Sequence, residues 1–180
     1  MRIIGGKYRG KKLWSPVGEG VRPTADRARE AIFNILYSHT GGDYSQLTLL
    51  DVFAGTGAFG LEAMSRGFKK VTFIDIDTTS VQKNVKMFAN DSEKLHILKA
   101  DAGCLQKARQ KYDVVFMDAP YNCGLTQKAL QQLIKQNWLN SGALCIVEIR
   151  HNEELEIPEF FELIDERIYG MAKVLFLIVK

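Results

Sequence analysis

The sequence predicts an α/β fold: a Rossmann-like, seven-stranded, mostly parallel sheet with helices on both faces. It also predicts an antiparallel hairpin at the C-terminal end and a small N-terminal β-hairpin extension. Three observations support this. From residue 47 onward, apolar strand-like segments alternate with helical segments, as in a parallel sheet covered on both faces. A glycine-rich loop follows the first strand. Four residues separate the last two strands, too few for a crossover helix, so those strands must be antiparallel.

We expect residues 1–22 to form a basic N-terminal hairpin and loop extension, and residues 23–180 to form the main domain. Residues 2–14 alternate apolar and basic side chains between glycine breakers, which predicts a β-hairpin. Pro23 and Thr24 then open a helix in which Thr24 can cap the first turn. Gly41 and Gly42 mark its end.

The alternating part of the chain contains all seven strands of the predicted sheet. We expect strands over residues 49–53, 71–74, 95–98, 114–117, 143–149, 160–168 and 173–179. We expect helices between them over residues 58–66, 80–89, 103–110 and 126–136.

Composition restricts the class of protein. The chain has 180 residues, of which 46% are hydrophobic, enough for one domain with its own core. Its three cysteines are widely spaced, without a His/Cys cluster, so we expect free thiols, no metal and a reducing compartment. We see no signal peptide and no apolar stretch of membrane-spanning length. We therefore expect a cytoplasmic protein, by default a monomer, with no membrane partner.

The charge is unevenly distributed. Residues 1–29 hold eight Lys or Arg and two acids, a net charge of +6, so residues 30–180 carry −3 of the total of +3. A basic end on a slightly acidic body indicates either a polyanion partner or a solvated surface.

The glycine-rich loop satisfies the pattern G-x-G-x-x-G with Gly55, Gly57 and Gly60. Asp75 follows Gly55 by 20 residues, at the end of the second strand, where an acid can accept hydrogen bonds from ribose hydroxyls. Both NAD and S-adenosylmethionine are bound by loops of this geometry, so the loop alone does not choose between the two ligands.

Three features favour S-adenosylmethionine as the cofactor. Asp51, just before the loop, suits a sulfonium-bearing ligand and would repel the phosphates of NAD. Asp101 closes the third strand and can accept from the adenine amine, and the C-terminal hairpin is unusual for a dehydrogenase. The expected cofactor-binding residues are Asp51, Ala54, Gly55, Thr56, Gly57, Asp75, Ile76, Asp101 and Ala102.

Asp118, Ala119, Pro120 and Tyr121 follow the fourth strand, and we expect them to be the catalytic residues. A nucleobase amine is a poor nucleophile because its lone pair is delocalised into the ring. Asp118 and the carbonyl of Ala119 can accept both of its N–H groups and turn the lone pair toward a methyl donor. Pro120 stiffens the turn, and Tyr121 offers a face on which the base can stack.

Four stretches of the sequence together resemble the 16S ribosomal RNA guanine-N2 methyltransferases of the RsmD family. They are residues 2–10 (RIIGGKYRG), 22–31 (RPTADRAREA), 51–57 (DVFAGTG) and 118–121 (DAPY). The first two stretches are the specific ones, because many methyltransferases share the glycine loop. In place of the family's Asp-Pro-Pro-Tyr, this chain has alanine at position 119, which keeps the backbone carbonyl but loosens the turn.

The resemblance implies methylation of one guanine N2 amine of 16S rRNA, in the small ribosomal subunit. It also implies that the basic N-terminal residues approach the RNA: Arg2, Lys7, Arg9, Lys11, Lys12, Arg22, Thr24 and Arg27. Alternatives are methylation of another exocyclic amine, such as adenine N6 in DNA or in other RNA, and a weakly active or non-catalytic RNA-binding assembly factor. An NAD-dependent oxidoreductase is the remaining enzyme class.

Overall fold

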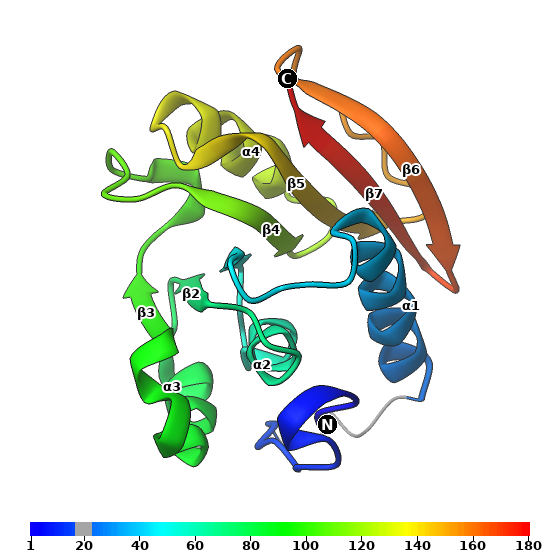
Figure 1. The fold of residues 1–180 in the computed structure, drawn as a ribbon. Coiled ribbons are helices and arrows are strands. Elements are labelled where there is room, and N and C mark those ends of the chain that lie inside the picture. The colour runs from blue at the N-terminus through cyan, green and yellow to red at the C-terminus, as the bar shows by residue number, and fades with distance from the viewer. Residues whose placement is uncertain (17–22) are drawn as a thin grey trace.

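The computed structural model describes residues 1–16 and 23–180 (Figure 1). Its sheet has seven strands in the order β3-β2-β1-β4-β5-β7-β6. The strands are β1 (Thr48–Val52), β2 (Lys70–Asp75), β3 (Leu95–Lys99), β4 (Tyr112–Asp118), β5 (Leu139–Arg150), β6 (Phe161–Tyr169) and β7 (Ala172–Val179). All seven predicted strands are confirmed, and β5 begins four residues earlier than expected.

One strand of the sheet, β7, runs opposite to all the others, so β6 points in the same direction as β1 to β5. Strands β1 to β5 pair in parallel, whereas β7 pairs antiparallel with both β5 and β6. The predicted C-terminal hairpin is therefore confirmed, with β7 inserted between β5 and β6. From β1 the chain continues to β2 and β3 on one side, whereas β4 lies on the other side of β1. The carboxyl ends of β1 and β4 therefore flank a topological switch point.

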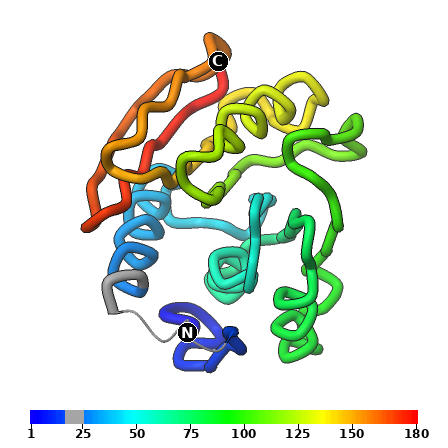
Figure 2. The backbone as a smooth tube through the Cα atoms, turned by 180° about the vertical axis from the view of Figure 1, so that it is seen from behind, coloured from blue at the N-terminus to red at the C-terminus, as the bar shows by residue number. Residues whose placement is uncertain are grey.

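Helices cover both faces of the sheet (Figures 1 and 2). One hydrophobic cluster contains residues of α1 (Pro23–His39), α2 (Ala58–Ser65) and α3 (Thr79–Val85), and the other contains residues of α4 (Leu125–Lys135). Strand β4 alternates between them: Phe116 lies in the first cluster, where its ring stacks on that of Phe59, and Met117 lies in the second. Each such side chain contributes about 1.5–3 kcal/mol when fully buried. None of the helices in the described part of the chain is long and apolar enough to cross a membrane.

The helix expected over residues 103–110 does not form. Only a three-residue 3₁₀ helix, Ala102–Cys104, is present, and the chain then runs without regular structure to β4. Distant groups hold this backbone instead: the indole of Trp138 donates to the carbonyl of Gln106, and the N–H of Ala108 donates to the carbonyl of Gln136. Tertiary hydrogen bonds therefore replace the intrahelical ones that the local pattern favoured.

The helix expected over residues 80–89 is shorter than predicted. Helix α3 ends at Val85, and 3₁₀ structure continues over Lys86–Lys94, interrupted by non-helical backbone angles at Phe88 and Asp91. Phe88 is fully buried and Asp91 accepts hydrogen bonds from Lys7 and Tyr8, so contacts with the N-terminal segment accompany the break.

The N-terminal segment folds back on itself, with one antiparallel bridge between Arg2 and Lys12 and a 3₁₀ helix over Gly6–Tyr8. The ladder is shorter than that of a regular hairpin because the two backbone N–H groups of Ile4 and Gly5 point elsewhere. Both donate 2.7 Å hydrogen bonds to the buried carboxylate of Glu62 on α2. The segment is thus attached to the helix that follows the glycine loop.

Candidate active site

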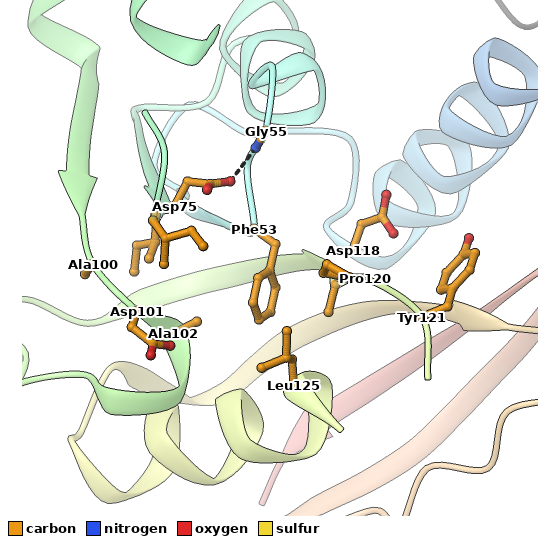
Figure 3. Close-up of a pocket in the computed structure, with 13 residues that line it drawn as sticks. Phe53, Gly55, Asp75, Ala100, Asp101, Ala102, Asp118, Pro120, Tyr121 and Leu125 are labelled. Atoms are coloured by element: carbon orange, nitrogen blue, oxygen red, sulfur yellow. Dashed lines mark hydrogen bonds between the residues drawn. The ribbon is translucent and has the colours of Figure 1, made fainter. Parts of the chain in front are cut away.

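A cavity of about 590 Å³ opens at the carboxyl ends of β1, β2 and β4 (Figure 3). This edge is where open α/β sheets bind their ligands. The cavity is lined by Phe53, Gly55, Ile74, Asp75, Ile76, Ala100, Asp101, Ala102, Asp118, Ala119, Pro120, Tyr121 and Leu125. All four predicted catalytic residues line it, as do five of the predicted cofactor-binding residues: Gly55, Asp75, Ile76, Asp101 and Ala102.

The glycine loop enters the cavity through two residues with positive φ. Phe53 has φ of 61° and Gly55 has φ of 53°. Positive φ is unusual for a residue such as phenylalanine and is found most often at functional sites. The N–H of Gly55 donates a 2.8 Å hydrogen bond to Oδ2 of Asp75, and the N–H of Asp77 donates to Oδ1. These two contacts fix the carboxylate of Asp75 at the cavity wall and leave it further lone pairs to accept from a ligand.

The other two glycines of the loop are required by packing. A Cβ on Gly57 would lie 2.6 Å from Val81, and one on Gly60 would lie 2.4 Å from the ring of Phe73. Gly57 also has φ of 75°, directly before α2. The pattern G-x-G-x-x-G therefore brings α2 against the sheet, and Gly55 alone of the three lines the cavity.

Asp51 lies inside the protein, toward α2. It is 2% exposed, and its Oδ2 accepts a 2.9 Å hydrogen bond from the N–H of Gly60. Burial raises the pKa of Asp51 to about 8, against the opposing effect of the Gly60 hydrogen bond. The hydrogen bond from Gly60 links β1 to the first turn of α2, away from the cavity.

Asp51, Ala54, Thr56 and Gly57 do not line the cavity. The hydroxyl of Thr56 contacts the sulfur of Met1 at 3.3 Å, and its carbonyl accepts from the buried amide of Asn84. These four residues therefore lie on the side of the loop that faces away from the cavity. Their predicted contact with the cofactor stays a prediction.

The opposite end of the cavity is formed where β3 ends. Asp101 accepts a 2.7 Å hydrogen bond from the N–H of Gly103 and so begins the short 3₁₀ helix, while Ala102 is buried beside it. One oxygen of Asp101 remains without a protein donor among the described residues. An acceptor at this end, with Ile76 and Ala102 nearby, is suited to a flat heterocycle bearing an amine.

Asp118 and Tyr121 lie at the third side of the cavity (Figure 3). Asp118 borders the open cavity, yet the surrounding protein and the negative charge of Glu148 raise its pKa to about 7. The hydroxyl of Tyr121 donates a 2.9 Å hydrogen bond to Oε1 of Glu148. Burial and this carboxylate both raise the pKa of Tyr121, which keeps the phenol neutral.

Five residues at the site were not among those predicted from the sequence: Glu148, Phe53, Ile74, Ala100 and Leu125. Glu148 lies near the end of β5 and is the register partner of Asp118 on β4. The apolar run of β5 is followed by an acid, as that of β4 is. This similarity could have marked Glu148 as a site residue in the sequence. Phe53, Ile74, Ala100 and Leu125 carry no functional group that would mark them in a sequence.

The predicted RNA-facing residues are divided between internal contacts and solvent. Lys7 pairs with Asp91 at 2.7 Å and Lys11 donates to the carbonyl of Met87, while Arg2 pairs with Asp26 at 3.3 Å. The remaining cations of the described set, Arg9, Lys12 and Arg27, are exposed. Arg22 lies outside the described residues, and so does the side chain of Thr24.

The chemistry of the cavity wall limits what it can bind. Asp75, Asp101 and Asp118 line the cavity, and no Lys or Arg of the described residues does. Such a wall favours a ligand with hydroxyl donors and positive charge and disfavours the pyrophosphate of a dinucleotide. No group of three His, Cys, Asp or Glu in the described part of the chain could hold a metal ion.

Comparison with known proteins gives matches over nearly the whole chain. A family model described as "Conserved hypothetical protein 95" matches residues 1–178. A ribosomal RNA small subunit methyltransferase D from Haemophilus influenzae is 38% identical over 180 residues, which cover 96% of this chain and 90% of the relative. The solved structure of "Putative methyltransferase yhhF" from Escherichia coli has a TM-score of 0.85 and 33% identity, over 100% of this chain and 98% of that one.

A more distant likeness concerns the fold alone. A magnesium protoporphyrin IX methyltransferase from Synechocystis, solved with bound S-adenosylmethionine, has a TM-score of 0.61 at 14% identity, over 91% of this chain and 87% of that one. The nearer matches include the N-terminal segment and the C-terminal hairpin as well as the glycine loop, since they span both chains almost completely. The chain therefore belongs to the RsmD family, that of the ribosomal RNA small subunit methyltransferases D.

Proposed function

We propose that this chain transfers a methyl group from S-adenosylmethionine to the exocyclic N2 amine of a guanine in small-subunit (16S) ribosomal RNA. The observation that carries the proposal is one shared cavity: Asp75 and Asp101 line one part of it, and Asp118 to Tyr121 border the other. A cofactor and a target base can meet only where both sets of residues face the same space. The family relatives named as ribosomal RNA small subunit methyltransferases support the choice of RNA.

The residues of the cavity fit the proposed cofactor. Asp75, held by the N–H groups of Gly55 and Asp77, has acceptor capacity for the two ribose hydroxyls. Ile76 and Ala102 offer apolar contact for the adenine, and the unpaired oxygen of Asp101 can accept from its amine. When bound, S-adenosylmethionine supplies an electrophilic methyl group on a positively charged sulfur.

The target amine would be oriented by two acceptors at the end of β4. The carboxylate of Asp118 and the backbone carbonyl of Ala119 each accept one N–H group, which directs the nitrogen lone pair into the cavity. Because the second acceptor is a main-chain atom, alanine at position 119 retains it. Ala119 is 3% exposed and therefore held by its packing.

Asp118 must be ionised to act as this acceptor. The new N–C bond would form as the bond between the methyl carbon and the sulfonium sulfur breaks, with a neutral thioether as the leaving group. The nitrogen would then be positive, and a carboxylate beside it would stabilise that charge. The proton can then leave to Asp118 or to water. The face of Tyr121, which is 38% exposed, would stack on the base once the nucleotide has left its helix or loop, a step that costs a few kcal/mol.

Positive charge at the N-terminal segment supports RNA as the substrate. Arg9, Lys12 and Arg27 are exposed and form no ion pair with the described residues. Contacts with phosphates would add affinity and orient the enzyme without reading sequence.

The test is transfer of labelled methyl from S-adenosylmethionine to small ribosomal subunits from a strain that lacks the modification. Naked small-subunit rRNA and duplex DNA serve as comparison substrates, and the Asp118→Ala variant serves as the catalytic control. Digestion and nucleoside mass spectrometry identify the product. We expect N2-methylguanosine on the subunits and none with the variant.

Two outcomes would contradict the proposal in different ways. Label in methyladenine or in DNA would keep the mechanism and overturn the substrate. Cofactor binding without label in any substrate would favour the non-catalytic assembly factor, and recovery of activity by Ala119→Pro would then assign the defect to position 119.

A further inference from the structure

A second groove lies beside the candidate active site, on the α4 side of the sheet. It has a volume of about 760 Å³ and runs between strand β3 and the segment that precedes β4. Ala100 and Asp101 line both this groove and the active-site cavity, so the two adjoin at the end of β3. Figure 1 shows the course of the long loop from β3 to β4. Residues of this loop, from Cys104 to Gln110, line the groove on one side.

The groove exists because the helix expected over residues 103–110 is absent. In a doubly wound sheet, a helix at this place would cover the face of β3. Here that face is uncovered: His96 and Leu98 are exposed, and Leu98 retains 39% of its surface. Helix α4 covers the more central strands, because its buried residues Leu130 and Leu133 pack in the cluster of β1, β4 and β5.

The rim of the groove is basic. Lys70, Lys99, Lys107 and Arg109 line it, against the single acid Asp101. None of the four cations forms an ion pair with another described residue. The chain beyond residue 29 carries a net charge of −3, so this concentration of positive charge is local.

A chain of hydrogen bonds crosses one end of the groove. Nζ of Lys70 donates 2.7 Å to Oε1 of Gln110, Gln110 donates to the hydroxyl of Tyr112, and Tyr112 donates 2.9 Å to Oγ1 of Thr72. Tyr112 and Thr72 are buried. This chain of bonds ties the end of the outer loop to strands β2 and β4.

We propose that this groove binds the phosphodiester backbone of the substrate RNA, as a contact surface separate from the N-terminal segment. Cations spread along a groove fit a chain of phosphates better than one compact anion. The exposed side chains of His96 and Leu98 offer contact for a ribose or base above the strand. The inference rests on RNA being the substrate, and the groove adjoins the active-site cavity at Ala100 and Asp101, so one RNA strand can contact both.

The test compares two triple variants of the full chain by equilibrium binding to a small-subunit rRNA fragment at several salt concentrations. The groove variant is Lys99→Gln, Lys107→Gln, Arg109→Gln, and the matched control is Lys135→Gln, Lys173→Gln, Lys180→Gln, which removes the same charge elsewhere. We expect the groove variant to weaken RNA binding about tenfold and to reduce the salt slope by about 2–3, since each phosphate contact contributes about 0.7–0.9. The control should change neither quantity appreciably.

Unchanged affinity and slope in the groove variant, or an equal loss in the control, would overturn the inference. Competition by pyrophosphate beyond its effect on ionic strength would assign the groove to a small phosphate ligand and would also overturn it. The melting temperature and cofactor binding show whether the triple variant folds. If it does not fold, the single substitution Lys107→Glu on the exposed loop replaces it, and it should also weaken RNA binding and reduce the salt slope.

Binding is measured without turnover, so the two proposals can fail separately. RNA binding through the groove with no methyl transfer would contradict the proposed function only. Methyl transfer with unchanged RNA affinity in the groove variant would contradict the groove only. Absence of salt-dependent RNA binding by the unsubstituted chain would contradict both.

Discussion

The hydroxyl of Tyr121 donates a 2.9 Å hydrogen bond to Oε1 of Glu148, across the gap between the loop after β4 and the end of β5. Glu148 is also the register partner of Asp118 on the adjacent parallel strand. One side chain therefore contacts the proposed stacking ring and lies beside the proposed acceptor of the target amine. Both relationships lead to measurable consequences.

Glu148 should act on catalysis through the Tyr121 ring. A hydrogen bond to a charged group contributes about 1.5–3 kcal/mol, which is partly offset at this half-exposed site. We expect Tyr121→Phe and Glu148→Ala each to lower single-turnover methylation about tenfold. The comparison is made at a pH well above 7, where Asp118 is ionised with or without the charge of Glu148. There, Glu148→Ala should have little further effect in the Tyr121→Phe background, and Glu148→Gln alone should restore part of the rate because an amide oxygen still accepts. Fully additive losses would show that Glu148 acts by another route.

The activity should depend on the ionisation of Asp118. Its side chain borders the open cavity, yet its pKa is raised to about 7, first because the surrounding protein displaces water from the carboxylate and then by the charge of Glu148. The ionised form is the acceptor, so kcat/KM should be highest above this pKa and fall as pH decreases through it. Glu148→Gln removes the nearby negative charge and should move the acidic limb to lower pH. A pH profile of methyl transfer for both proteins makes the comparison, and an unshifted limb would contradict the assignment to Asp118.

Asp75 should dominate cofactor affinity. Its carboxylate is fixed by the N–H groups of Gly55 and Asp77 and faces the cavity. Asp75→Ala removes the proposed ribose acceptor, and we expect the Kd for S-adenosylhomocysteine to rise at least tenfold in calorimetric titration. Asp77→Ala is the matched control, since Asp77 does not line the cavity and should change the Kd less than threefold. Equal effects of the two substitutions would remove the proposed role.

Glu62 should contribute strongly to stability. Its carboxylate is fully buried and accepts from the N–H groups of Ile4 and Gly5 and from the guanidinium of Arg66 at 2.7 Å. Glu62→Ala leaves these donors without a partner, and we expect a loss of about 3 kcal/mol or more in the free energy of unfolding. Urea denaturation measures it, with the exposed Glu30→Ala as control. A loss below about 1 kcal/mol would mean that the N-terminal segment is held mainly by other contacts.

Much of the fold could be predicted because its signals are local. Apolar runs of strand length and the short turn before β7 specify the strands and the direction of the last pair without reference to distant residues. The helix expected over residues 103–110 failed because Trp138 and Gln136, far along the chain, bind its backbone. A local pattern holds no information about such partners.

The candidate site also contains some features that the local sequence predicts and others that depend on the assembled sheet. The glycine loop, Asp75 and Asp118 to Tyr121 are marked by their residue types at strand ends, and the structure brings them to one cavity. The contribution of Glu148 depends on the register between β4 and β5, which only the assembled sheet defines. The buried position of Asp51 likewise follows from which face of β1 it occupies, because it shares the α2 face with Leu49.

We propose that cofactor and target base meet in the cavity between Asp75 and Tyr121. The decisive measurement is a crystal structure of the chain with S-adenosylhomocysteine. We expect the ribose at the carboxylate of Asp75, the adenine between Ile76 and Ala102, and the sulfur directed toward Asp118. A ligand bound elsewhere, or one whose sulfur points away from Asp118, would contradict it.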